Sequence, residues 1–130
     1  MTVFVDTSAI YALIDRADAG HERAVRGRSV VEGEELVTHE YVVLETVSLV
    51  RHRLGPGPAV RLIDDFLPAL AVIDVTPSVR DRAMAAFRAG IETSVSLVDR
   101  TSFEVMRDRG IDRAFALDQD FASAGFQLVS

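Results

Sequence analysis

Short, mostly apolar runs alternate along this chain with longer stretches in which apolar residues recur every three or four positions. The short runs are β-strand candidates, because polar residues, glycine or proline bound them. They cover residues 2–5, 35–39, 69–75, 113–117 and 126–129. Strands that are apolar on both faces are typical of a parallel sheet with helices on both sides.

The longer stretches predict helices over residues 8–17, 19–32, 39–54, 59–67, 77–89 and 96–109. Capping signals support several ends: Thr38 before the third helix, Thr76 followed by proline before the fifth, and Gly110 after the last. GPGP at 55–58 predicts a turn. The middle of the third helix, YVVLETVSLV, is apolar on nearly every side, which predicts burial. Strands and helices alternate from end to end, which indicates an α/β fold.

Composition excludes several kinds of chemistry. The 130 residues fit one domain over 1–130, and the absence of cysteine excludes disulfides, thiolate zinc sites and thiol nucleophiles. All 14 basic residues are arginine, so mechanisms that need lysine are excluded as well. The net charge of −6 argues against a general nucleic-acid coat. Without a signal peptide or a long apolar run, we expect a cytoplasmic protein with no membrane contact.

Two acidic residues follow predicted strands. Asp6 comes directly after residues 2–5, and Asp118 follows residues 113–117. In open α/β sheets, ligands bind beyond the carboxyl ends of the strands, so both positions are candidates for chemistry. The simpler interpretations are a helix N-cap for Asp6 and an Asx-turn for Asp118.

Two further acids lie on apolar helix faces. Glu45 has Val42 and Leu49 at helical spacing, and Asp99 has Phe103 and Met106, so both carboxylates are expected to face the interior. A lone buried carboxylate costs several kcal/mol unless something compensates its charge. For Glu45 the alternative is a core glutamate that forms an ion pair with an arginine. For Asp99 the alternative is a capping box with Ser96.

Carboxylates from four separate segments therefore meet at one end of the predicted sheet. Their repulsion requires cations among them, and oxygen ligands without histidine or cysteine favour Mg²⁺ or Mn²⁺ over zinc. Such ions polarise a scissile phosphate and activate water for in-line attack, which suggests phosphate-ester hydrolysis. Glu45 could orient that water or accept its proton.

Four segments resemble the PIN domain family, and specifically the VapC-like ribonuclease toxins of type II toxin–antitoxin modules. They are VFVDTSAIYALID, LETVSL, SLVDRTSFEVM and RAFALDQDFASAGF, which together span most of the chain. The resemblance implies a three-layer α/β/α sandwich and a metal-dependent endoribonuclease that uses Mg²⁺ or Mn²⁺. It also implies a cognate VapB-like antitoxin, an RNA substrate, and a homodimer or a toxin–antitoxin hetero-oligomer.

Carried over by position, the resemblance makes Asp6, Asp99 and Asp118 the metal ligands and Glu45 a further catalytic acid. Asp120 competes with Asp118 or supplements it. Thr7 and Ser8 would lie beside the site and contact substrate.

Arginines offer a cationic approach for RNA. Arg51 is a candidate substrate contact within the segment 51–53, and a second group comprises Arg16, Arg23, Arg26 and Arg28. Solvated or paired surface arginines are the simpler interpretation. The histidines lack metal-ligand spacing and are interpreted as surface or capping residues. The alternative function is a non-catalytic PIN-fold module that binds protein or RNA.

Overall fold

The computed structural model describes residues 1–129, which form a five-stranded sheet and its flanking helices. In chain order the elements are β1 (Thr2–Val5), α1 (Thr7–Ile14), α2 (His21–Val30), β2 (Glu35–His39), α3 (Glu40–Leu54), α4 (Pro56–Arg61), β3 (Ala71–Ile73), α5 (Pro77–Ala89), α6 (Leu97–Arg109), β4 (Arg113–Phe115), α7 (Asp120–Ser123) and β5 (Gln127–Leu128). A π-helical turn, Leu62–Phe66, and a 3-10 turn, Leu67–Ala69, join α4 to β3.

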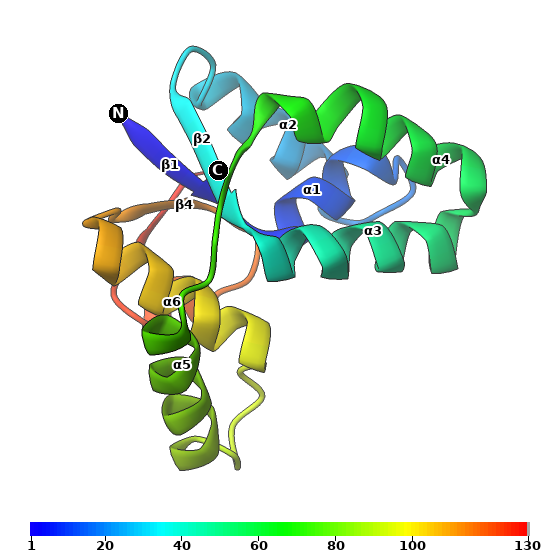
Figure 1. The fold of residues 1–130 in the computed structure, drawn as a ribbon. Coiled ribbons are helices and arrows are strands. Elements are labelled where there is room, and N and C mark those ends of the chain that lie inside the picture. Colours follow the sequence, from blue (N-terminus) through cyan, green and yellow to red (C-terminus); the bar gives the residue numbers. More distant parts are fainter. Residues whose placement is uncertain (130) are drawn as a thin grey trace.

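All strand pairs are parallel, and the strand order is β3-β2-β1-β4-β5. The chain moves from β1 outward to β3 and then returns to β4 on the other side of β1. Because parallel crossovers are right-handed, this reversal places α1 to α4 on one face and α5 to α7 on the other. Figure 1 shows these two helical layers on either side of the strands. The predicted three-layer α/β/α sandwich is confirmed.

The core lies on both faces of β1. Phe4 and Val5 are almost completely buried, and the Phe4 ring packs against Phe121 with 6.2 Å between the ring centroids. Helix α2 approaches β4 closely, because a Cβ atom at Gly27 would lie 2.6 Å from the Phe115 ring. Glycine at this position therefore allows the helix to pack on the sheet.

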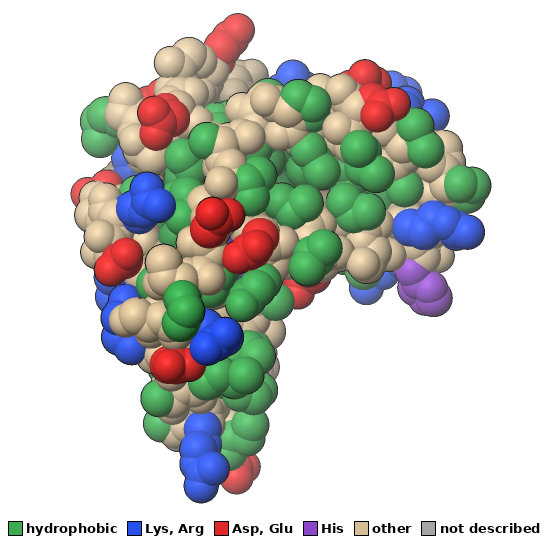
Figure 2. Space-filling view, viewed as in Figure 1, with side chains coloured by type: hydrophobic (Ala, Val, Ile, Leu, Met, Phe, Trp, Pro, Cys, Tyr) green, Lys and Arg blue, Asp and Glu red, His purple; other side chains and the backbone are tan. Residues whose placement is uncertain are grey.

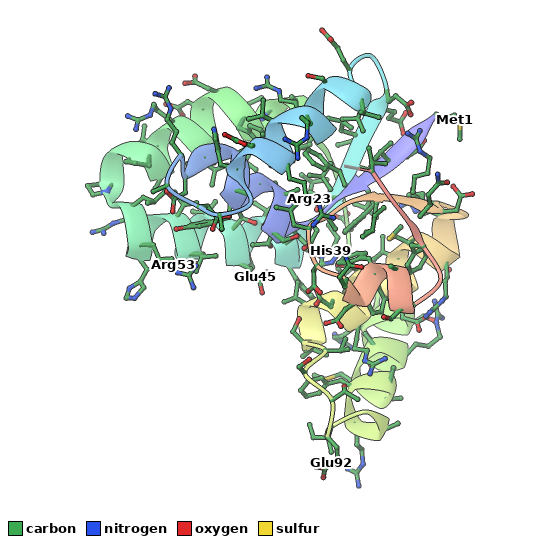
Figure 3. The ribbon with its side chains drawn as sticks, turned by 180° about the vertical axis from the view of Figure 1, so that it is seen from behind. Met1, Arg23, His39, Glu45, Arg53 and Glu92 are labelled. Carbon is green, nitrogen blue, oxygen red and sulfur yellow. The ribbon has the colours of Figure 1, made fainter. Side chains whose placement is uncertain are left out.

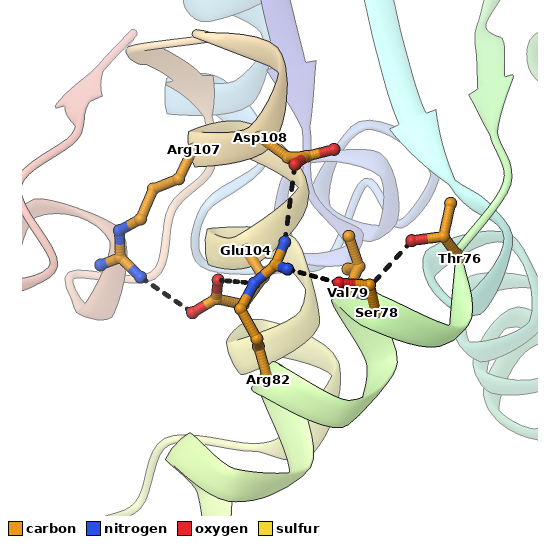
Figure 4. Close-up of polar contacts among 7 residues, drawn as sticks. All are labelled: Thr76, Ser78, Val79, Arg82, Glu104, Arg107 and Asp108. Carbon is orange, nitrogen blue, oxygen red and sulfur yellow. Dashed lines mark hydrogen bonds and ion pairs between the residues drawn. The ribbon is translucent and has the colours of Figure 1, made fainter.

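Helices α5 and α6 form an antiparallel hairpin that projects from the sheet. The Arg82 guanidinium joins the two helices through Glu104, with its Nε 3.2 Å from a carboxylate oxygen, and through Asp108 at 3.5 Å (Figure 4). Thr76 caps α5 by accepting a hydrogen bond from the Val79 amide, as its sequence signal predicted. The last turn of α6 ends at Gly110 in the left-handed conformation.

Several predicted boundaries are wrong. The N-cap of α3 is His39 and not Thr38, whose hydroxyl donates instead to the carbonyl of Val5. Helix α1 ends at Ile14, three residues before the predicted end. Segment 55–58 was predicted as a turn, but helix α4 already begins within it at Pro56. Proline is common at the first position of a helix. The fourth strand ends at Phe115, two residues before the predicted end, and the short helix α7 follows it before β5.

Helix α3 is less buried than its apolar sequence predicted. Val42, Thr46 and Val50 face the core, but 66% of the Leu44 surface is exposed. Figure 2 shows hydrophobic side chains gathered over the lobe that contains α3 and α4. In the described part of the chain, no helix combines the length and apolar character that crossing a membrane requires.

Candidate active site

Asp6 lies at the point where the strand order reverses, between β1 and β4. Its backbone amide donates to the carbonyl of Phe115 at 3.0 Å, which holds it beside the neighbouring strand. Its carboxylate also caps α1, because one oxygen accepts from the Ser8 amide at 3.1 Å. Only 3% of Asp6 is exposed. The N-cap interpretation is therefore correct, and it coexists with a place at the crevice where α/β folds bind ligands.

Ser8 connects the two strand ends. Its hydroxyl donates to the same oxygen of Asp6 at 2.7 Å and accepts from the Leu117 amide at 2.9 Å. Leu117 directly precedes Asp118. One side chain thus fixes the spacing between Asp6 and the acidic segment after β4.

Asp99 enters the site from α6. The helix begins at the Ser96 N-cap, whose hydroxyl accepts from the Asp99 amide at 3.0 Å, so this half of the predicted capping box is present. The carboxylate points into the protein, as predicted, and only 8% of the residue is exposed. Burial, together with the negative charges of Asp6, Asp118 and Glu45, raises the pKa of Asp99 to about 8.

Asp99, Asp118 and Asp120 form the tightest acidic group. One carboxylate oxygen from each lies within 4.8 Å of the others. Asp118 also forms the predicted Asx-turn, because it accepts from the Asp120 amide at 2.9 Å. Burial and then the Asp118 carboxylate raise the pKa of Asp120. The structure therefore brings both C-terminal acids, Asp118 and Asp120, to the site. Position alone does not exclude either of them as a metal ligand.

Glu45 lies on α3 at the edge of this group and is half-buried. Its charge is among the causes that raise the pKa of Asp6 and of Asp99, so it belongs to the same electrostatic cluster. The alternative of a core glutamate paired with arginine is wrong, since within residues 1–129 no arginine forms an ion pair with it.

A buried histidine holds the two helices of the site in register. His39 Nδ1 accepts from the Tyr41 amide at 3.1 Å, and Nε2 then donates to the Ser102 hydroxyl at 2.9 Å. Burial lowers the pKa of His39 to about 4, so the ring is neutral at physiological pH. The prediction of a capping histidine is confirmed. Through Ser102 it fixes the start of α3 against α6, the helix that carries Asp99.

This arrangement fits a hard divalent cation. Burial is the largest cause that raises the pKa of Asp6 to about 6, and the charges of Glu45 and Asp118 add to it. One oxygen of the Asp6 carboxylate is buried and has no hydrogen-bond partner among the described residues. An ion among these carboxylates would satisfy the orphaned oxygen and neutralise the repulsion. The all-oxygen donor set suits Mg²⁺ or Mn²⁺.

Arg100 contributes a cation that the sequence did not indicate. Its position next to Asp99 suggested the solvated face of α6, but the side chain is half-buried and lies over Gly90, where a Cβ would overlap it. Its positive charge opposes the rise in the pKa of Asp120. Its Nε is buried without a partner in the described chain. Its guanidinium donates to the Thr93 hydroxyl at 3.4 Å, so the α5–α6 loop determines where this positive charge lies.

The three predicted substrate contacts, Thr7, Ser8 and Arg51, differ in their exposure to solvent. Thr7 is buried, and its hydroxyl and that of Thr46 hydrogen-bond to each other across 3.0 Å. Ser8 is engaged as described above. Arg51 is exposed on α3. Arg23 reaches the carbonyl of Leu117 at 3.5 Å, which brings a guanidinium close to the acids; Figure 3 shows Arg23, His39 and Glu45 around the same region.

The chain belongs to the PIN domain family, because the family's sequence model matches residues 3–127. A relative from Mycobacterium tuberculosis, the 23S rRNA-specific endonuclease VapC20, is 36% identical over 128 residues, which cover 98% of this chain and 97% of the relative.

Solved structures also resemble this chain in fold. The crystal structure of Mycobacterium tuberculosis VapC20, described as a sarcin–ricin loop cleaving toxin, superposes with a TM-score of 0.85 at 36% identity over 95% of both chains. FitAcB from Neisseria gonorrhoeae has a TM-score of 0.73 at 15% identity, covering 100% of this chain and 97% of that one. The latter likeness supports the fold alone.

Proposed function

We propose that this PIN domain is the endoribonuclease toxin of a toxin–antitoxin module. The observation that carries the proposal is the meeting of five carboxylates from four separate segments at the reversal point of a parallel sheet. Three of them place an oxygen within 4.8 Å of one another. The repulsion among these carboxylates is offset when a cation binds between them, and such a cation can also bind the phosphate of a substrate. The similarity to VapC20 supports RNA as the substrate.

Each residue has a role in this proposal. Asp99, Asp118 and Asp120 would hold the cation, and Asp6 would contribute its oxygen that has no hydrogen-bond partner. Glu45, which is half-buried, is free to accept a proton from the attacking water. Mg²⁺ or Mn²⁺ bound there supplies positive charge to the phosphate oxygens and makes water a stronger nucleophile.

Other residues of the chain support these acids. Ser8 fixes Asp6 relative to the segment after β4. His39 holds α3 against α6, so that Glu45 and Asp99 keep their separation. Such groups would act by positioning, because catalysis depends on holding reacting groups in place.

The substrate to test first is the sarcin–ricin loop of 23S rRNA, because the relatives that are 36% identical are described by that target. The partner we propose is a VapB-like antitoxin that covers the acidic site. Solved structures with this fold include VapBC2 from Rickettsia felis on promoter DNA, with a TM-score of 0.73 at 13% identity over 98% of this chain and 97% of that one.

The experiment is cleavage of ribosomal RNA by purified protein, alone and with Mg²⁺, Mn²⁺ or EDTA. Wild type is compared with Asp99→Asn, which alters the site, and with Asp64→Asn, which removes one exposed charge elsewhere. Discrete fragments from wild type and Asp64→Asn, absent with EDTA or with Asp99→Asn, would support the proposal. If folded, antitoxin-free protein produced no metal-dependent fragments, the non-catalytic binding module would be preferred.

A further inference from the structure

Helices α1 and α3 extend side by side away from the acids. Helix α1 begins directly after its N-cap Asp6, and α3 carries Glu45. A hydrogen bond between Thr7 and Thr46 joins the two helices near the site. Farther along, the guanidinium carbon of Arg53 lies 5.3 Å from the centroid of the Tyr11 ring. A cation is therefore held on an aromatic ring beyond the catalytic acids.

Contacts around Tyr11 fix this ring. Its hydroxyl donates to Asp15 Oδ2 at 2.7 Å, and Asp15 Oδ1 accepts from the Ala17 amide at 3.0 Å. Both oxygens of Asp15 thus have donors already. Arg53 is exposed, and within residues 1–129 none of its nitrogens lies within 4.0 Å of a carboxylate oxygen. One side of the guanidinium also faces the Tyr11 hydroxyl, and its remaining donors are available to an anion from outside the chain.

The helix geometry relates Arg53 to the active site. Arg53 is eight residues after Glu45, which corresponds to a rise of about 12 Å and a rotation of about 80° around the helix. Arg51 is rotated about 120° in the opposite direction. In Figure 3, Glu45 and Arg53 both lie along the lower edge of α3. A separation of about 12 Å exceeds the rise of one nucleotide, roughly 3.4 Å, so Arg53 would meet a phosphate other than the scissile one.

We propose that Arg53, held on Tyr11, is a binding subsite for an RNA phosphate beyond the scissile one. The subsite rests on the endoribonuclease function proposed above. A guanidinium stacked on an aromatic ring keeps its planar fork oriented, and that fork matches the oxygens of a phosphate. RNA needs such an anchor here, because the acids and the net charge of −6 repel it.

The test measures RNA binding at several salt concentrations. A labelled single-stranded oligonucleotide is titrated, by fluorescence anisotropy, with Asp99→Asn protein so that it stays intact. In this background, Arg53→Ala is compared with Arg88→Ala, which removes an exposed arginine from the last turn of α5 as Arg53 lies in the last turn of α3. Arg53→Lys keeps the charge without the fork.

A lost phosphate contact reduces the slope of log affinity against log salt by about 0.7 for a single strand. We expect this reduction for Arg53→Ala and none for Arg88→Ala. Between about 50 and about 200 mM salt, Arg53→Ala should then lose about threefold less affinity than its parent. Arg53→Lys should keep the slope but bind more weakly at each salt concentration.

Equal slopes for Arg53→Ala and its parent would overturn the inference, even if the variant melted at a lower temperature, because a purely structural contact with Tyr11 changes stability alone. Cleavage by otherwise wild-type protein separates the two proposals. If it cleaves RNA but Arg53→Ala has an unchanged KM, the subsite is wrong and the nuclease stands. If it cleaves no RNA while the slopes still differ, the nuclease is wrong and the RNA contact stands.

Discussion

Replacing Asp6 by asparagine should stabilise the metal-free protein. The ionised carboxylate is buried among other acids, and the rise in the pKa of Asp6 from 3.8 to about 6 corresponds to a cost of about 3 kcal/mol at neutral pH. Asparagine removes the charge and is about as good an N-cap as aspartate, so the bond from the Ser8 amide can persist. The free energy of unfolding should therefore increase by up to about 3 kcal/mol, which is on the order of 10 °C in Tm.

The sign of the pH dependence follows from the direction of the shift. The folded protein holds the Asp6 proton more tightly than the unfolded chain does. The resulting stability is fully present below pH 3.8 and is lost as the pH rises through about 6. The advantage of Asp6→Asn over wild type should therefore be largest above pH 6 and vanish toward pH 3.8. Aspartates that are stabilised by ion pairs have the opposite dependence.

The assay is urea and thermal unfolding in EDTA, followed by circular dichroism across this pH range. Asp64→Asn is the control, because it removes the same formal charge from an exposed position and should change stability little. Added Mg²⁺ should stabilise wild type and not Asp6→Asn, since a ligand of the native state raises its stability by mass action. An Asp6→Asn protein that is less stable than wild type near neutral pH would refute the reasoning and leave capping as the dominant role.

Three further results are expected. Burial and neighbouring charges raise the pKa of Asp99 to about 8, so a cation that binds there must displace a proton. Mg²⁺ affinity measured by calorimetry should therefore increase steeply from pH 6 to 8, and an affinity that does not change with pH would contradict this. Ser8→Ala should lower the free energy of unfolding by about 1–2 kcal/mol in urea melts, whereas Ser29→Ala, at an exposed hydroxyl, should change it little. Arg100→Ala should strengthen Mg²⁺ binding measured by calorimetry, because it removes a positive charge that acts on Asp120 and repels a second cation; an equal effect of Arg109→Ala, an exposed arginine, would exclude that cause.

The pattern of apolar residues determined the fold class. Each of the five predicted strands contains an observed strand, because short apolar runs bounded by polar residues, glycine or proline favour strands even at the sheet edge, where β3 is mostly exposed. Helices α5 and α6 were predicted within one residue of their observed ends, since Thr76, Ser96 and Gly110 are local signals that act within one helical turn. The ends of β1 and β4 then located Asp6 and, less closely, Asp118.

Errors arose where tertiary contacts overrode the local signal. Thr38 is a good N-cap by type, but its hydroxyl donates to β1, and buried His39 caps α3 instead. An apolar sequence in α3 predicted complete burial, yet Leu44 is mostly exposed, because periodicity reports apolar positions and not which of them a neighbour covers.

The sequence predicted only part of the candidate active site. Helical periodicity pointed Asp99 inward, and the end of the first predicted strand located Asp6, because both signals depend on a few neighbouring residues. The distances among the acids, the bridge from Ser8 to Leu117 and the placement of Arg53 over Tyr11 join segments far apart in the chain. The sequence alone determined which residues end strands and face inward; only the tertiary structure decided which of them meet, because contacts between distant segments depend on how the sheet and helices pack.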